Sequence, residues 1–174
     1  MKKIGFIGVG VMGKSMVLNL MKNGFEVSVY TRTKSKASEV IEKGAKWCDS
    51  VKDCVADADA VITMVGFPKD VEEVYFGEDG ILNNVRPGSY VIDMTTTSPK
   101  LSKRIYREAL EKGVYALDAP VSGGDVGAQK GTLAIMVGGD KEAFEKCYKI
   151  FEALGTNIIY EGPEGAGQHT KMAN

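Results

Sequence analysis

Three glycines near the N-terminus separate a strand-like apolar run from a segment with helical spacing. The strand-like run covers residues 4–8 and the helical spacing covers residues 11–22, so Gly8, Gly10 and Gly13 fall at the junction. In a G-x-G-x-x-G fingerprint the first glycine makes a tight turn, the second lets the backbone approach a pyrophosphate, and the third allows close helix packing. The junction therefore predicts a dinucleotide-binding βαβ unit. The alternative is a glycine-rich turn that binds nothing.

Strand-like runs recur along the chain and alternate with segments of helical periodicity. They cover residues 4–8, 26–30, 60–65, 89–93 and 114–118. Continuous apolar strands that alternate with amphipathic helices bury both faces of a parallel sheet. The pattern therefore predicts an α/β fold, a Rossmann-like doubly wound sheet.

The segment between residues 119 and 132 breaks this alternation. It contains the run PVSGGDVGAQKGT, whose glycines and proline argue against a crossover helix before the next strand-like run at residues 133–137. A strand reached without a crossover is expected to run antiparallel to its predecessor. With a last strand at residues 157–160, we expect seven or eight strands in a mainly parallel sheet with an added antiparallel strand.

The composition is that of an ordinary globular protein of 174 residues, enough for one packed core. Its 22 basic side chains nearly balance 23 acidic ones, which gives little electrostatic reason to expect nucleic acid or a membrane as a partner. The apolar runs are far shorter than the ~20 residues of a membrane span. The N-terminus leads into a strand instead of a signal peptide, so we expect a soluble, cytoplasmic protein.

Metal and disulfide chemistry are not indicated by the sequence. Cys48, Cys54 and Cys147 form no CxxC pair, and His169 is the single histidine. We expect inert thiols, no metal ion, and a surface or interface position for His169.

The end of the second strand carries hydroxyls and cations instead of the acidic residue that binds a ribose 2′-hydroxyl. The sequence there is Tyr30-Thr31-Arg32-Thr33-Lys34. A planar guanidinium suits a 2′-phosphate, so the segment predicts that NADP(H) is preferred over NAD(H). The alternative is that these cations belong to a solvated loop and helix start.

The third and fourth strands also end at the edge where doubly wound sheets bind ligands. Met64 and Val65 end one strand, and Thr95 and Thr96 follow the other, where their hydroxyls would face a cofactor. Ser98 is expected to cap the next helix. The candidate cofactor-binding residues are Gly8, Gly10, Val11, Met12, Gly13, Thr31, Arg32, Thr33, Met64, Val65, Thr95 and Thr96.

Five segments together resemble a known family. They are residues 8–13, residues 30–33, DAPVSGG at 118–124, GTLAIMVGG at 131–139 and GAGQHTKMAN at 165–174. The chain resembles, over its whole length, the β-hydroxyacid dehydrogenase family, which includes 3-hydroxyisobutyrate dehydrogenase, tartronate semialdehyde reductase and glyoxylate/succinic semialdehyde reductase. 6-Phosphogluconate dehydrogenase is a more distant relative.

The resemblance implies roles for five residues. Ser122, Gly123 and Gly124 match the segment that holds a substrate carboxylate, Lys171 matches the catalytic lysine, and Asn174 matches an asparagine that helps position the substrate. From spacing alone, the two glycines could serve a turn between strands, and the lysine could be an ordinary solvated residue.

The resemblance further implies a hydride-transfer enzyme that interconverts a small β-hydroxyacid and its semialdehyde or oxoacid. A non-catalytic nucleotide-binding or redox-sensing module is the alternative. An imine reductase is a third possibility, although such relatives usually replace the lysine.

The resemblance also implies an all-helical second domain and a homo-oligomeric full-length protein. We therefore expect residues 1–162 to form the dinucleotide-binding domain and residues 163–174 to begin the interdomain helix, with the C-terminal helical domain absent. The last helix is expected to be frayed or packed against a neighbouring molecule, and this chain alone is expected to bind NADP(H) with hardly any turnover.

Overall fold

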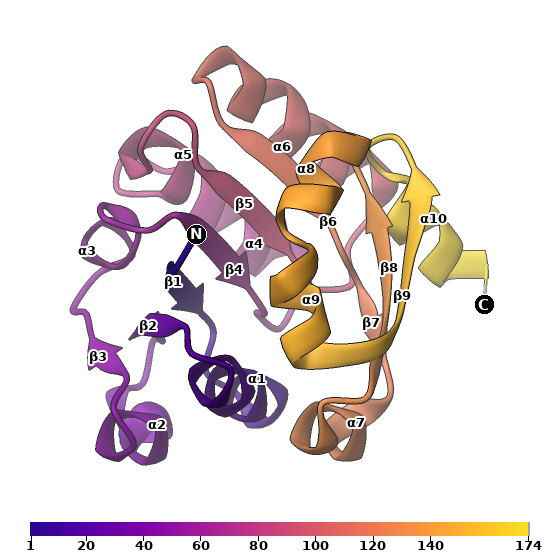
Figure 1. Ribbon diagram of the computed structural model, residues 1–174. Coiled ribbons are helices and arrows are strands. Elements are labelled where there is room, and N and C mark those ends of the chain that lie inside the picture. The colour runs from indigo at the N-terminus through magenta and orange to yellow at the C-terminus, as the bar shows by residue number, and fades with distance from the viewer. Residues whose placement is uncertain (174) are drawn as a thin grey trace.

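The computed structural model describes residues 1–173 and contains a single nine-stranded sheet with helices on both faces (Figure 1). The strand order is β3-β2-β1-β4-β5-β6-β8-β7, and β9 pairs with β8. The strands are β1 (Lys3–Ile7), β2 (Glu26–Tyr30), β3 (Lys46–Trp47), β4 (Ala60–Thr63), β5 (Tyr90–Asp93), β6 (Tyr115–Asp118), β7 (Val121–Ser122), β8 (Leu133–Gly138) and β9 (Gly155–Gly162).

The helices are mostly short. They are α1 (Val11–Lys22), the 3₁₀ helix η1 (Lys34–Ala37), α2 (Ser38–Glu42), α3 (Val51–Val55), α4 (Pro68–Phe76), α5 (Ile81–Asn84), α6 (Pro99–Glu111), α7 (Gly124–Lys130), α8 (Lys141–Lys146), α9 (Tyr148–Leu154) and α10 (Ala166–Ala173). The Ser98 hydroxyl accepts a hydrogen bond from the Leu101 backbone N–H, which confirms the predicted cap of α6.

Strands β1 to β6 are parallel, as predicted, and their order reverses beside β1. Ile7 pairs with Tyr30 of β2 on one side and with Thr63 of β4 on the other. The chain first winds outward through β2 and β3 and then returns to β4 across β1. Such a reversal opens a crevice at the carboxyl ends of the strands, which is where doubly wound sheets bind ligands.

Strand β8 is antiparallel to β6 and β7, which confirms the added antiparallel strand. The preceding segment does form helix α7, which the sequence did not predict, but α7 joins two antiparallel strands and is not a crossover helix. Gly123 and Gly131 flank the helix with positive φ values of 133° and 69°, which glycine adopts readily, and Gly131 forms a left-handed C-cap. Gly127 lies inside it, and its missing side chain lets α7 approach Leu133. Two strands of only two residues, β3 and β7, raise the count to nine.

Alternate residues of the central strands enter two separate cores. Phe6 and Ile62 pack into the core covered by α1 and α9, while Ile7 and Val61 pack into the core covered by α4 and α6. All four side chains are at most 2% exposed, as expected for strands buried on both faces. Within residues 1–173, no helix is both long and apolar enough to cross a membrane.

Candidate functional site

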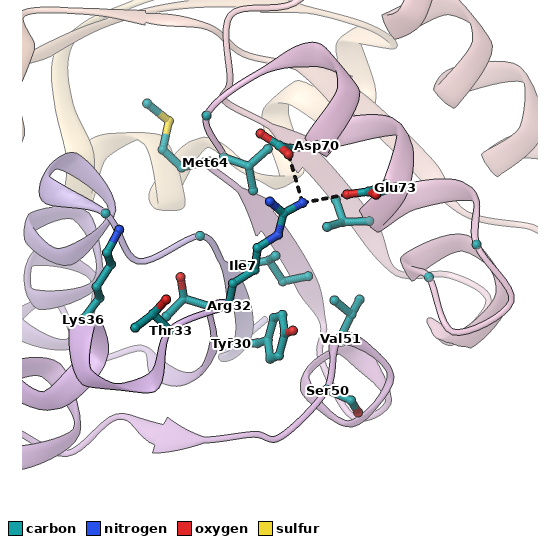
Figure 2. A pocket seen from close by; sticks show the side chains of 18 of the residues that line it. Ile7, Tyr30, Arg32, Thr33, Lys36, Ser50, Val51, Met64, Asp70 and Glu73 are labelled. Carbon is teal, nitrogen blue, oxygen red and sulfur yellow. Dashed lines mark hydrogen bonds and ion pairs between the residues drawn. The ribbon is translucent and has the colours of Figure 1, made fainter.

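A pocket of about 590 Å³ opens at the carboxyl ends of β1, β2 and β4 (Figure 2). Its walls come from the β1–α1 turn, the end of β2, the segment after β3, and helix α4. Seven of the predicted cofactor-binding residues line it: Gly8, Gly10, Thr31, Arg32, Thr33, Met64 and Val65. The sequence fingerprint and the crevice at the strand reversal thus coincide.

Close backbone contacts require two of the three fingerprint glycines, and the third leaves the start of α1 open. Gly8 has a φ of 103°, and a Cβ there would collide with the Met64 carbonyl oxygen. A Cβ at Gly13 would collide with the Gly8 carbonyl oxygen. Gly10 faces open space, with nothing within 4 Å of an added Cβ. A pyrophosphate could therefore approach the backbone at the start of α1, so the residues present fit a dinucleotide.

Five other candidates are not among the described residues that line the pocket. Val11 and Thr96 are exposed, Met12 is half-buried, and Gly13 and Thr95 are buried. The Thr95 hydroxyl accepts a hydrogen bond from the Val65 backbone N–H at 3.0 Å. It shapes the loop after β4 rather than pointing into the pocket.

Sequence reasoning missed the wall opposite the fingerprint. Residues after β3 and on α4 complete the lining, together with neighbours of the predicted residues: Ile7, Tyr30, Lys36, Asp49, Ser50, Val51, Gly66, Asp70, Glu73, Val74, Gly77, Asp79 and Gly80. Strand β3 has only two residues, too few for a periodic signal. The start of α4 was detectable, because Pro68 occupies its first turn.

Arg32 extends from the end of β2 toward α4 (Figure 2). Its Nη2 donates to Asp70 Oδ1 at 2.9 Å and to Glu73 Oε2 at 2.6 Å. The second Asp70 oxygen accepts from the Phe67 backbone N–H at 3.0 Å, at the start of α4. The guanidinium is therefore paired with two carboxylates, although its side chain stays 66% exposed, so the alternative of a solvated loop is not excluded by this contact.

A second group of predicted residues meets near the sheet edge opposite β3, where α10 packs on β8. Lys171 Nζ donates to Ser122 Oγ at 2.7 Å, and both residues are half-buried. Gly123 and Gly124 follow with positive φ values of 133° and 60°. The resemblance assigned these residues to one site, and the fold brings them together. Asn174 lies outside the described residues.

The position of Lys171 is fixed by the start of α10. Asp118, at the end of β6, accepts from the Gly165 N–H at 2.9 Å and from the Gln168 N–H at 3.0 Å. These are the free donors that begin a helix. The fully buried Gln168 side chain donates to the Thr95 carbonyl at 2.8 Å and accepts from the Thr97 N–H at 2.9 Å.

These contacts correct the expectation that the last segment is frayed, while its packing against a neighbouring molecule stays a prediction. Through Ala173 it is helical and packs against β8, β9 and α6 of its own domain (Figure 1). Gly167 makes this possible, because a Cβ there would collide with the Met136 carbonyl oxygen. Periodicity gave no signal for Gln168, although it lies one helical turn before Lys171.

Two buried carboxyl groups, those of Asp93 and Asp118, lie side by side at the ends of β5 and β6. Burial raises the pKa of Asp93 to about 7, although it accepts hydrogen bonds from Thr63 Oγ1 at 2.9 Å and from the Thr95 N–H at 3.1 Å. Burial also raises the pKa of Asp118, and the backbone N–H groups at the start of α10 oppose this shift. Among residues 1–173, no cluster of His, Cys, Asp or Glu side chains has the make-up of a metal site.

Residues 3–162 match the family described as the NAD binding domain of 6-phosphogluconate dehydrogenase. The chain belongs to this family. This confirms the predicted dinucleotide-binding fold. The chain is 62% identical over 173 residues to an uncharacterized oxidoreductase, YkwC, of Bacillus subtilis, covering 99% of this chain and 60% of that protein. It is 44% identical to an NAD-dependent L-serine dehydrogenase of Pseudomonas aeruginosa, covering 100% of this chain and 58% of that one.

A solved structure of the same group agrees with this assignment. The Mycobacterium tuberculosis 3-hydroxyisobutyrate dehydrogenase with L-serine superposes with a TM-score of 0.95 at 37% identity, covering 100% of this chain and 59% of that one. The chain thus spans about 60% of the length of the curated relatives it matches. It is a nucleotide-binding domain of the β-hydroxyacid dehydrogenase type.

Proposed function

We propose that this chain is the cofactor domain of a longer, cytoplasmic, homo-oligomeric enzyme that interconverts a small β-hydroxyacid and its semialdehyde or oxoacid. The observation that carries the proposal is the 2.7 Å hydrogen bond from Lys171 to Ser122. It joins a proton donor to a loop suited to a carboxylate, in a fold that also has a dinucleotide pocket. A binding or redox-sensing module without chemistry has no use for this pairing.

The loop at Ser122 supplies the groups that a carboxylate needs. A hydroxyl and the backbone N–H groups of two glycines with positive φ can donate to an anion without a side chain in the way. L-serine and 3-hydroxyisobutyrate, named for two of the relatives, both carry a hydroxyl on the carbon next but one to the carboxylate carbon. When such a substrate is held by its carboxylate, its reacting oxygen lies at a short, fixed distance from the loop at Ser122.

Lys171 is the group that handles the proton in this proposal. A bound nicotinamide cofactor supplies or accepts the hydride. The Lys171 ammonium donates a proton to the carbonyl oxygen during reduction, and the neutral amine accepts it during oxidation. Asp118 and Gln168 act on this step only by holding α10 in place. We further propose that residues 163–174 begin the helix that leads to a C-terminal helical domain, with Asn174 beside the substrate.

The first test is a substrate panel on the full-length protein and on the 174-residue chain. We expect the full-length protein to reduce a short semialdehyde acid, or to oxidise its β-hydroxyacid, and the chain alone to bind cofactor with hardly any turnover. A catalytic site must hold its proton donor within about 3 Å of the reacting oxygen, and the relatives have further residues that this chain lacks. Robust turnover by the chain alone contradicts the two-domain proposal, and cofactor binding without any turnover by the full-length protein favours the non-catalytic module.

The cofactor preference rests on Arg32. We propose that its guanidinium binds a 2′-phosphate, so that NADP(H) binds more tightly than NAD(H). Arg32→Ala is expected to weaken NADPH binding by about 10- to 100-fold, the value of a charge-assisted two-point contact, and to leave NADH affinity within about twofold. Calorimetric titration of both cofactors measures this. Arg107→Ala, at an exposed arginine of α6, is the control. Equal losses for the two cofactors would rule out the assignment.

A further inference from the structure

The pocket carries an acidic pair that the cofactor fingerprint does not explain. Asp70 and Glu73 lie one turn apart on α4, and both of their carboxylates contact the Nη2 atom of Arg32 (Figure 2). Asp70 also caps α4 through the Phe67 N–H. Among the described residues, Glu73 makes no ion pair other than the one with Arg32. Its carboxylate is therefore the part of the contact that no structural role accounts for.

Because both carboxylates contact Nη2, this atom limits what else Arg32 can bind. A guanidinium has two edges that can grip a phosphate with a pair of nitrogens, and Nη2 belongs to both edges. Nη2 carries two hydrogens, and the contacts at 2.9 Å and 2.6 Å engage it with two carboxylates. A 2′-phosphate can make a two-point contact with Arg32 only by displacing at least one of them. NAD(H), which has a hydroxyl at this position, requires no displacement.

The charges around the pocket also disfavour binding of a 2′-phosphate. Its lining contains four carboxylates, those of Asp49, Asp70, Glu73 and Asp79, against two cations, Arg32 and Lys36. A 2′-phosphate adds up to about two negative charges near pH 7, so the nearest carboxylates repel it. The Arg32 and Glu73 side chains are 66% and 58% exposed, which limits the size of the effect through solvent screening.

We propose that Glu73, with Asp70, determines cofactor selectivity by competing with the 2′-phosphate of NADP(H) for Arg32. This competition lowers the affinity for NADP(H) and so reduces the ratio of NADP(H) affinity to NAD(H) affinity. This inference rests on the proposed role of Arg32. In this arrangement, Asp70 and Glu73 of α4 lie beside the adenosine ribose of the bound cofactor. Glu73 does not touch the reacting atoms and sets selectivity through Arg32.

Glu73→Gln tests the inference in the 174-residue chain and in the full-length protein. We expect the variant to bind NADPH about 3- to 10-fold more tightly, with NADH affinity within about twofold, because one competing charge is lost from an exposed pair. Adenosine 2′,5′-bisphosphate against 5′-AMP repeats the comparison with probes that differ only in the 2′-phosphate. Glu72→Gln removes the same charge from the neighbouring exposed position of α4, away from Arg32, and serves as the matched control.

The outcomes separate this inference from the assignment on which it rests. If Arg32→Ala abolishes the NADPH preference and Glu73→Gln leaves the NADPH-to-NADH ratio unchanged, only the competition is wrong. Weaker NADPH binding in Glu73→Gln also overturns it, because the carboxylates would then hold Arg32 ready for the phosphate. If Arg32→Ala leaves the ratio of NADPH to NADH affinity unchanged, the proposed role of Arg32 in binding the 2′-phosphate is itself wrong. In the double variant Arg32→Ala/Glu73→Gln, the gain from the glutamine is expected to disappear.

Discussion

Replacing Lys171 with alanine in the full-length protein is expected to lower turnover by about 100-fold or more while cofactor affinity stays within about twofold. The ammonium lies on α10, and its hydrogen bond to Ser122 places it at the candidate substrate loop. The cofactor pocket is lined by other elements, which explains why binding is spared. Steady-state kinetics and a cofactor titration on the same preparation measure the two effects.

Two further variants separate proton transfer from mere packing. Lys146→Ala removes an exposed lysine from α8 and is expected to leave turnover unchanged. Ser122→Ala is expected to raise KM more than it lowers kcat, because the hydroxyl belongs to the carboxylate loop. A small primary amine added to Lys171→Ala is expected to restore part of the lost turnover. If the alanine variant keeps most of its turnover, Lys171 has no role in the chemistry.

The sequence predicted those parts of the fold and the site that have a local cause. The spacing of the glycines at 8, 10 and 13 marks the turn from β1 into α1, and apolar runs define the parallel strands. The local sequence does not indicate helix α7, because glycines usually oppose helix formation, whereas two of the glycines here cap its ends. Its packing on β8 depends on Gly127 facing Leu133, a tertiary contact that no local pattern reports.

The pocket wall formed by α4 was missed for a similar reason. Arg32 and Glu73 are 41 residues apart, and nothing in either local sequence indicates that they meet. The same holds for Gln168, whose amide joins Thr95 and Thr97 across more than 70 residues of chain. Contacts of this kind follow from strand order, which places the ends of distant strands at one edge. Lys171 could be assigned only through family resemblance, since spacing does not distinguish it from a solvated lysine.

The buried Asp93 predicts a pH-dependent stability that Asp93→Asn should remove. Burial raises its pKa from 3.8 to about 7 in the folded protein. Between these values the folded state binds more protons at this site than the unfolded state, so the free energy of unfolding falls as pH rises. At about 1.4 kcal/mol for each pKa unit, the change amounts to about 4 kcal/mol between about pH 4 and pH 8. Chemical denaturation of wild type and variant across this range measures it.

Asparagine suits the test because its side-chain oxygen can still accept from Thr63 Oγ1 and from the Thr95 N–H, the two contacts of Asp93 Oδ1. The variant is expected to gain stability over the wild type as pH rises, since the amide has no charge to bury. Asp125→Asn, at an exposed carboxylate of α7, is the matched control and should follow the wild-type curve. If Asp93→Asn and wild type give parallel curves from about pH 4 to pH 8, the Asp93 carboxyl does not titrate in this range, and its burial is compensated by interactions other than protonation.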